Sequence, residues 1–299
     1  MKITFCLTTT LFLLFASRSF AQIDSLRQEI ENIIATKKTD IGISVLGIED
    51  NDTLSINGNK NYPLMSVFKF PIALYVLYKV DKDELDLNQK LLVRKSDVVP
   101  DTWSPIREKY PNGGIKLSLA DILNYTVSQS DNIGCDILLR LIGGPMSVQN
   151  YINKIGAGGF VIKVNEEAMR KDFGTQRINT ATPLAATQLL KIFYDNKVLS
   201  RKSNDFLKKL LTETSTGNNR IKGQLPKETV VAHKTGTSDT NKEGLTIATN
   251  DIGVVTLPNG NHFAISVFVS DSKENTDTNE KIIADIAKLT WNYFNSKTK

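Results

Sequence analysis

Ser66 and Lys69 stand at a spacing that suits nucleophilic catalysis. Residues three apart on a helix share a face, so the Lys69 amine can reach the Ser66 hydroxyl. A serine hydroxyl is a weak nucleophile until a neighbouring base takes its proton. A helix that begins here also offers free N–H groups and the positive end of its dipole to a developing oxyanion. The pair therefore predicts a nucleophilic serine; the other interpretation is a capping serine beside a solvated lysine.

A second polar group, Ser130-Asp131-Asn132, falls where two helical segments meet. A hydroxyl at Ser130 can pass a proton to a leaving nitrogen, and the Asn132 amide can bind an amide of a substrate. The competing interpretation is a helix cap, since Ser, Asp and Asn are all favoured at that position.

A third group, Lys234-Thr235-Gly236, ends a segment rich in β-branched residues. Lys234 supplies positive charge and Thr235 a hydroxyl for a substrate carboxylate, while Gly236 allows a ligand to approach the backbone closely. The N–H of Thr237 can complete an oxyanion hole with the N–H of Ser66. The alternative is an edge strand with ordinary polar residues.

The elements that must position these groups follow from the spacing of apolar residues. The chain has 299 residues, 40% hydrophobic and 23% charged, as expected for a globular protein of one or two domains. Helical spacing dominates the middle, and β-branched runs lie before and after it. We expect helices at 25–37, 67–80, 119–128, 132–142, 183–194, 202–212 and 279–294, and strands at 41–48, 53–56, 229–234, 247–257 and 262–269.

This order of elements predicts an α+β fold. The two ends of the chain should pair into one antiparallel sheet flanked by the N- and C-terminal helices, while the middle forms an all-helical lobe. Residues 22–65 and 214–299 then make one discontinuous α/β lobe, and residues 66–213 the helical lobe. The cleft between the lobes is the natural place for a ligand.

The first residues have the pattern of a cleaved secretory signal. Lys2 precedes an apolar run at 3–15, and small residues precede a cut near Ala21–Gln22. The run is too short to span a bilayer, and no later stretch reaches that length. We therefore expect residues 1–21 to be a signal peptide and the mature protein to be secreted, periplasmic and without a membrane anchor.

Composition argues against several partners and cofactors. The net charge of +5 is too mild to indicate a nucleic-acid or membrane surface. Cys135 is the one cysteine beyond the signal, which excludes an internal disulfide and favours a buried thiol. His233 and His262 lack a cluster at metal-ligand spacing, so we expect neither a metal nor another cofactor. We also expect a monomer.

Taken together, the S-x-x-K, S-D-N and K-T-G groups resemble the signature of the class A β-lactamases and their relatives, the penicillin-binding proteins. Each tripeptide is expected by chance in fewer than about one in ten chains of this size. The resemblance implies the β-lactamase/transpeptidase-like fold and small-molecule β-lactams as substrates. It also implies that Ser66 is acylated and that Ser130 protonates the departing nitrogen.

The two families differ in whether the acyl group is released from the serine. A β-lactamase needs a base that drives water onto the ester, whereas a penicillin-binding protein lacks it and stays acylated. The resemblance identifies residues 161–179 as the omega loop and Glu166 as the deacylation base, with Glu167 a weaker candidate. Whether Lys69 or Glu166 is the acylation base is disputed in the family and stays open here.

Further segments resemble the VEB, PER and TLA branch of extended-spectrum enzymes. This resemblance implies hydrolysis of penicillins and cephalosporins, oxyimino-cephalosporins included, and a role in antibiotic resistance. The segments are Trp103-Ser104-Pro105, Asn124-Tyr125-Thr126-Val127, Ser130 to Leu139, Asn165-Glu166-Glu167, Lys222-Gly223-Gln224-Leu225-Pro226 and Thr290-Trp291-Asn292-Tyr293.

Two positions depart from the wider class A pattern. Arg170 stands where many members have an Asn that helps to hold the deacylating water, which leaves the anchoring of that water open. Glu167 follows Glu166 where many members have a cis bond to proline. A non-proline cis bond costs about 2.5–4 kcal/mol. We therefore predict a trans bond and a rearranged omega loop that widens the cleft.

Two more residues are candidates for substrate binding. Arg220 is expected to be a second cation for the substrate carboxylate, its alternative being a surface arginine. Trp103 is expected to flank the mouth of the cleft and stack on the substrate, its alternative being a core aromatic. Two other functions stay open, a DD-peptidase of the penicillin-binding type and a non-catalytic β-lactam sensor, but neither explains Glu166.

Overall fold

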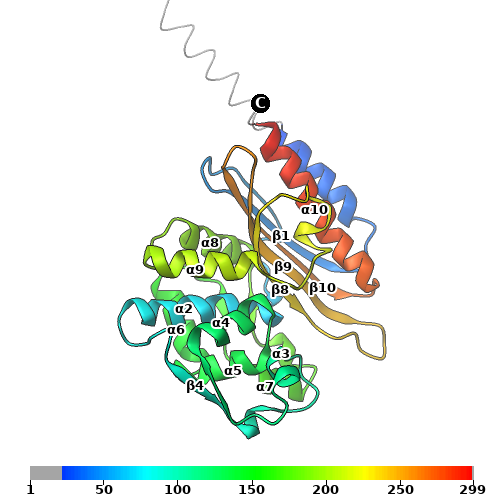
Figure 1. The fold of residues 1–299 in the computed structure, drawn as a ribbon. Helices are drawn as coiled ribbons and strands as arrows, with labels where there is room; N and C mark the ends of the chain where they lie inside the picture. Colours follow the sequence, from blue (N-terminus) through cyan, green and yellow to red (C-terminus); the bar gives the residue numbers. More distant parts are fainter. Residues whose placement is uncertain (1–21, 298–299) are drawn as a thin grey trace, which may run out of the picture.

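The computed structural model describes residues 22–297, so the expected signal peptide lies outside the described residues. A five-stranded antiparallel sheet combines both ends of the chain, in the order β2-β1-β10-β9-β8 (Figure 1). This arrangement confirms the predicted α+β fold. The strands are β1 (Asp40–Gly47), β2 (Thr53–Ile56), β8 (Val231–Thr237), β9 (Thr246–Thr256) and β10 (His262–Ser272).

Helices cover both faces of the sheet, which is why its strands are buried on both sides. On one face, the helix at residues 22–34 and α10 (Thr276–Ser296) pack on apolar side chains of the strands, such as Ile43, Phe263 and Ile265. On the other face, α8 (Pro183–Tyr194) lies against β1 and β10 (Figure 1). The terminal helices and the terminal strands share one hydrophobic core. This core is complete only when both ends of the chain have come together.

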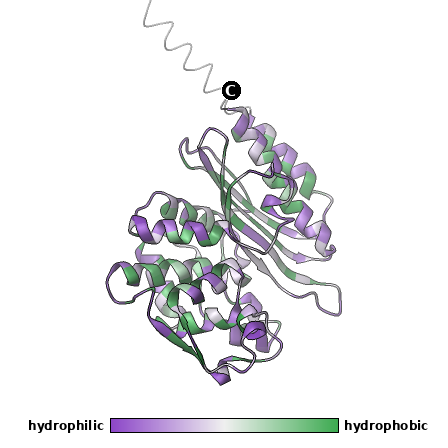
Figure 2. Ribbon diagram, viewed as in Figure 1, coloured by the Kyte–Doolittle hydropathy of each residue, from purple (hydrophilic) through white to green (hydrophobic). Residues whose placement is uncertain are grey.

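The middle of the chain packs around α2 (Lys69–Asp81), whose residues 69–74 are all buried. Hydrophobic and hydrophilic residues share each helix in this part of the chain (Figure 2), and the hydrophobic ones contribute to one buried core. Local caps begin these helices where the sequence places Ser, Thr or Asp, as at Ser118 and Asp131. The surrounding helices are α3 (Pro105–Lys109), α4 (Leu119–Ser128), α5 (Asn132–Leu141), α6 (Pro145–Lys154), α7 (Glu166–Lys171) and α9 (Arg201–Thr212).

The helical lobe is not all-helical, which corrects that expectation. It carries a two-stranded sheet, β4 (Lys90–Val93) with β5 (Ile115–Ser118), and a small sheet in the order β3-β7-β6. Strands of two to four residues are too short to show the alternation that marks a strand in a sequence. The small sheet is formed by β3 (Tyr62–Pro63), β7 (Thr180–Ala181) and β6 (Phe160–Val161).

The division of the chain into lobes at 65/66 and 213/214 stays a prediction. One apolar core runs from the helices onto the inner face of the sheet, where it includes Ile252 and Phe268. Within residues 22–297, no helix is long and apolar enough to cross a membrane.

Candidate active site

Ser66 lies in a 3-10 turn, Met65–Phe68, that leads directly into α2. The contact that the S-x-x-K spacing predicts is present, because Lys69 Nζ lies 2.9 Å from Ser66 Oγ. Met65, just before the serine, has a φ of 45°, a left-handed conformation that is uncommon outside glycine. The backbone therefore makes a sharp turn directly before Ser66, and the packing around this turn must stabilise it.

Lys69 is fully buried and connects the candidate residues to one another. Its Nζ donates to Ser130 O at 2.8 Å and to Asn132 Oδ1 at 2.5 Å. It also lies 2.8 Å from Glu166 Oε1, a carboxylate that is itself only 9% exposed. A buried ammonium is tolerated only when it is paired and hydrogen-bonded, and these partners meet that requirement.

Ser130 lies between two buried lysines. Its carbonyl oxygen accepts from Lys69, and its hydroxyl accepts from Lys234 Nζ at 2.9 Å. Burial lowers the pKa of Lys234 well below its usual value, and the charge of Lys69 lowers it further. Ser130 also has a left-handed backbone, with a φ of 59°. The hydroxyl is thus fixed in place next to a lysine that gives up a proton more readily than a solvated one.

Gly236 lies where the K-T-G strand meets the turn that carries Ser66. A side chain there would overlap the carbonyl oxygen of Leu64 and would press on Val67 and Met65. The turn that carries Ser66 therefore comes close to the backbone at Gly236, and the approach of a ligand there stays a prediction. On the next strand, Asn250 Nδ2 donates to Pro63 O at 2.7 Å and so holds the same turn.

Arg220 is buried, which excludes a surface arginine. Its Nη2 donates to Thr237 Oγ1 at 2.8 Å, and its Nη1 to Asn250 O at 2.9 Å. Its Nε lies 3.0 Å from Glu280 Oε1 on α10. Arg220 therefore reaches the K-T-G strand as expected, and it orients the hydroxyl of Thr237. On the same strand, the Thr235 hydroxyl bonds to that of Thr216 at 2.6 Å.

Trp103 is 57% exposed, which excludes a core aromatic. Its indole Nε1 donates to Gln129 O at 2.8 Å, next to the S-D-N group. The backbone oxygen of Trp103 accepts from Asn132 N at 3.0 Å. The neighbouring Thr102 Oγ1 accepts from Asn132 Nδ2, also at 3.0 Å. The segment that carries the tryptophan thus fixes the Asn132 amide.

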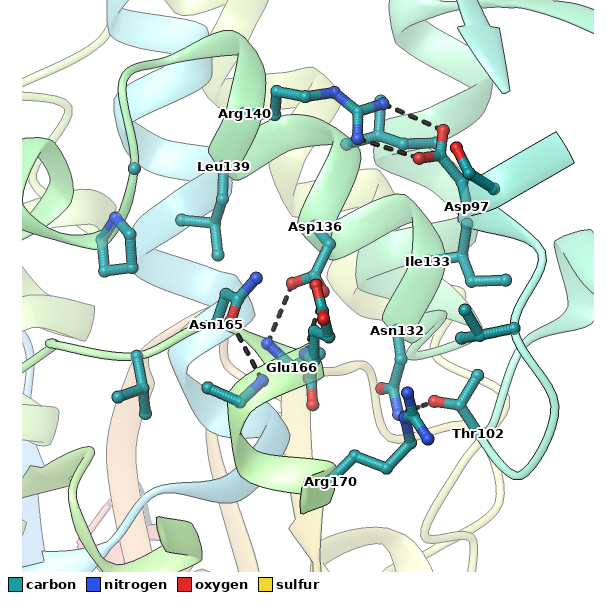
Figure 3. Close-up of a pocket in the computed structure, with 18 of the residues that line it drawn as sticks. Asp97, Thr102, Asn132, Ile133, Asp136, Leu139, Arg140, Asn165, Glu166 and Arg170 are labelled. Carbon is teal, nitrogen blue, oxygen red and sulfur yellow. Dashed lines mark hydrogen bonds and ion pairs between the residues drawn. The ribbon is translucent and has the colours of Figure 1, made fainter. Parts of the chain in front are cut away.

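Asp136 holds the backbone of the omega loop at Glu166, and sequence reasoning missed it. Its two carboxylate oxygens accept from the N–H groups of Glu166 and Glu167, each at 2.9 Å (Figure 3). The Glu166–Glu167 bond is trans, like every peptide bond in the described residues, so the trans prediction is confirmed. Burial raises the pKa of Asp136 to about 6, against the effect of the two N–H bonds.

Signals for this arrangement are present in the sequence. Asp136 follows Asn132 by one helical turn, so the two share a face of α5. Asn165 caps α7 by accepting from Ala168 N at 3.1 Å, with acidic residues in the first turn and basic residues in the last. That pattern is typical of a short helix, although the stretch lacks apolar periodicity. Asn179 closes the base of the loop through bonds to Lys163 N and Val164 N.

A pocket of about 560 Å³ opens between the omega loop, α5 and the segment at 96–102. Asn132 and Glu166 line it, so it adjoins the catalytic group (Figure 3). Arg170, whose position raised the question of water anchoring, is exposed on α7 at the same pocket. The two histidines lie elsewhere: His233 is buried against Asp251, and His262 pairs with Glu49.

The sequence and the structure are similar to those of known proteins. The model of the β-lactamase enzyme family matches residues 25–294. Beta-lactamase VEB-1 of Pseudomonas aeruginosa is 54% identical over 93% of both chains. Extended-spectrum beta-lactamase PER-1, also of Pseudomonas aeruginosa, is 40% identical over 96% of this chain and 93% of its own. The crystal structure of TLA-3 extended-spectrum beta-lactamase, 54% identical, superposes with a TM-score of 0.90 over 91% of this chain and 99% of its own.

Proposed function

Because this chain belongs to the β-lactamase enzyme family, as a serine enzyme of class A, we propose that Ser66 opens the lactam ring and Glu166 drives its release. Hydrolysis of β-lactams and antibiotic resistance follow from membership of the class. The proposal concerns the residues that perform the reaction. The observation that carries it is the position of Lys69 Nζ, 2.9 Å from Ser66 Oγ and 2.8 Å from Glu166 Oε1.

In the acylation step, Ser66 Oγ attacks the lactam carbonyl and its proton passes to Lys69. Lys69 can accept that proton once it has given its own to Glu166, with which it is in direct contact. The backbone N–H groups of Ser66 and Thr237 stabilise the oxyanion that forms on the carbonyl oxygen. As the C–N bond breaks, Ser130 gives its proton to the nitrogen and regains one from Lys234, whose lowered pKa favours the transfer.

Before deacylation, the proton that Glu166 took from Lys69 passes to Lys234, which lost one through Ser130, so that Glu166 is again a carboxylate. Glu166 then takes a proton from a water molecule, which attacks the ester carbonyl. The bond to Ser66 Oγ breaks, and the serine recovers its proton as the product acid leaves. General-base catalysis of this kind contributes about 10²–10⁴-fold. The N–H bonds from Glu166 and Glu167 to Asp136 support the proposal, because they fix the backbone from which Glu166 reaches the ester.

Substrate binding uses groups on both sides of Ser66. We assign the substrate carboxylate to Lys234, Thr235 and, through Thr237, Arg220, and the side-chain amide to Asn132. Gly236 contributes by keeping the K-T-G strand against the Ser66 turn. Trp103 provides an exposed ring beside the S-D-N group.

The proposed substrate range rests on the descriptions of two relatives. PER-1 and TLA-3 are described as extended-spectrum enzymes, so we propose that penicillins and cephalosporins, oxyimino-cephalosporins among them, are substrates here. The pocket beside the omega loop is consistent with the widened cleft that we predict. We also propose a secreted, periplasmic monomer that needs no cofactor.

Glu166→Gln tests the mechanism. This variant should still be acylated, although more slowly, because Ser66 and Lys69 remain but Lys69 must release its proton to solvent instead of to Glu166. Deacylation should slow at least about 10³-fold because the amide cannot take a proton from water. Intact mass should then show a stable acyl adduct on Ser66. Glu167→Gln is the matched control and should turn over normally.

Rapid turnover by Glu166→Gln would refute the assignment of the base. A wild-type enzyme that stays acylated after one equivalent of penicillin would favour the DD-peptidase instead. Binding without any covalent adduct would favour the sensor.

A further inference from the structure

Arg170 is a cation without a partner in a pocket whose other charges are mostly paired. Among the pocket's lining residues, Asp97 binds Arg140 through two contacts of 2.9 Å, and Glu167 pairs with Lys171 at 3.0 Å. Glu166 pairs with Lys69, and Asp136 accepts two backbone N–H groups. Within the described residues, the side chains of Arg170 and Lys163 form no ion pair or hydrogen bond. Apart from Asp136, which has N–H donors but no cation beside it, the charges left unpaired at this pocket are therefore positive.

Arg170 also points toward the residue that we assign to the substrate amide. In Figure 3 its side chain runs from α7 toward Asn132 and Thr102. One N–H of the Asn132 amide is used by Thr102, and its oxygen is held by Lys69. The second N–H is left for a substrate. Asn132 and Arg170 both line the pocket of about 560 Å³, so we expect a side chain that continues beyond this amide to extend into it.

We propose that Arg170 selects β-lactams whose acylamino side chain ends in a carboxylate. The inference rests on the proposed function, because it needs the lactam at Ser66 and its amide at Asn132. A guanidinium presents N–H donors in a planar fork that matches a carboxylate, and such charge-assisted bonds are stronger than neutral ones. Lys163, the other unpaired cation among the described lining residues, adds to the positive potential of the pocket.

Two other roles for Arg170 make different predictions. If its guanidinium held the deacylating water, its loss would slow the release of every substrate equally and the acyl-enzyme would accumulate. If it were only a solvated surface charge, its loss would change nothing. A role in side-chain recognition affects one class of substrate and acts on kcat/KM.

The test compares two oxyimino-cephalosporins that differ at one group, a side-chain carboxylate and its methyl ester. The proteins are the wild type, Arg170→Gln, Arg170→Lys and the charge-matched control Lys171→Gln. We expect Arg170→Gln to lower kcat/KM for the acid about tenfold relative to the ester, as for the loss of one charge-assisted bond. Arg170→Lys should recover part of this difference, and Lys171→Gln should show none.

Ionic strength gives a second readout. Salt should reduce the wild-type preference for the acid, because part of the attraction is screened, and should leave the ratio in Arg170→Gln unchanged. An acid-to-ester ratio that is the same in Arg170→Gln and the wild type would overturn the inference while leaving the proposed function intact. A wild type that forms an acyl-enzyme with neither compound, nor with a penicillin, would instead overturn the proposed function.

Discussion

The two sides of the active site are built differently. On the nucleophile side, Lys69 and Lys234 are both buried, and each binds Ser130 through a separate atom. On the omega-loop side, the backbone at Glu166 and Glu167 is held by one carboxylate, that of Asp136, and Glu167 and Arg170 are exposed. The groups that form the acyl-enzyme are thus fixed by several contacts at once. The group that releases it depends on few contacts, so mutations should separate the two steps.

Lys69→Met should produce the largest effect. Methionine has a similar length but no amine, so Ser66 loses its base and Glu166 loses its cation. We expect the acylation rate to fall at least about 10³-fold, measured by stopped-flow with a chromogenic cephalosporin. Lys79→Met, on the same helix but paired with Glu84 away from the site, is the control. Acylation within tenfold of wild type would show that the nucleophile side does not depend on this lysine.

Asp136→Asn should affect mainly the other step. An amide offers one acceptor oxygen where the carboxylate offers two, so one of the N–H groups of Glu166 and Glu167 loses its partner. A displacement of about 1 Å in a catalytic group can lower a rate about 10²-fold. We expect a loss of that size in deacylation, with acylation within a few-fold of wild type. Single-turnover measurements separate the two rates.

Asp97→Asn is the control for Asp136→Asn, because Asp97 lines the same pocket but pairs with Arg140. If Asp136→Asn lowered the acylation and deacylation rates equally, the two sides of the active site would not act on separate steps. Such equal losses would show that the loop also positions the nucleophile.

The smallest effect is on stability and depends on pH. The pKa of Asp136 is raised from 3.8 to about 6 in the folded protein, so the folded state holds this proton more tightly than the unfolded chain. Its contribution to the free energy of unfolding is therefore largest below pH 4 and decreases as the pH rises through 6. Relative to Asp136→Asn, the wild type should lose up to about 3 kcal/mol across this range, as urea titrations at several pH values can measure. A constant difference would contradict the burial of an ionised carboxylate at Asp136.

The nucleophile side was predictable because its signals are local. The spacing of Ser66 and Lys69 fixes a shared helical face, and the β-branched segment before Lys234 fixes a strand. The sheet was predictable from the runs of β-branched residues at both ends of the chain. Such patterns depend on neighbours in the sequence, so one chain is enough to show them.

The other contacts depend on residues that lie far apart in the chain. The ion pair between Arg220 and Glu280 joins a loop to α10. Gly236 in β8 lies against the backbone of Leu64, which precedes the turn that carries Ser66. No spacing rule relates such pairs. The role of Asp136 could not be predicted for a similar reason. A carboxylate on a helix is ordinarily solvated, and the sequence does not show that the omega loop folds over this one.

The contacts around Gly236 also bear on how the enzyme matures. The turn that presents Ser66 is held by Asn250 and by the backbone at Gly236, both supplied by the last third of the chain. The first strand of the sheet likewise pairs with β10, Asp40 opposite Ser270. Pairings between such distant residues are slow to form. A growing chain therefore has no oriented nucleophile until its C-terminal strands are in place, and acylation by a β-lactam reports on a completely folded molecule.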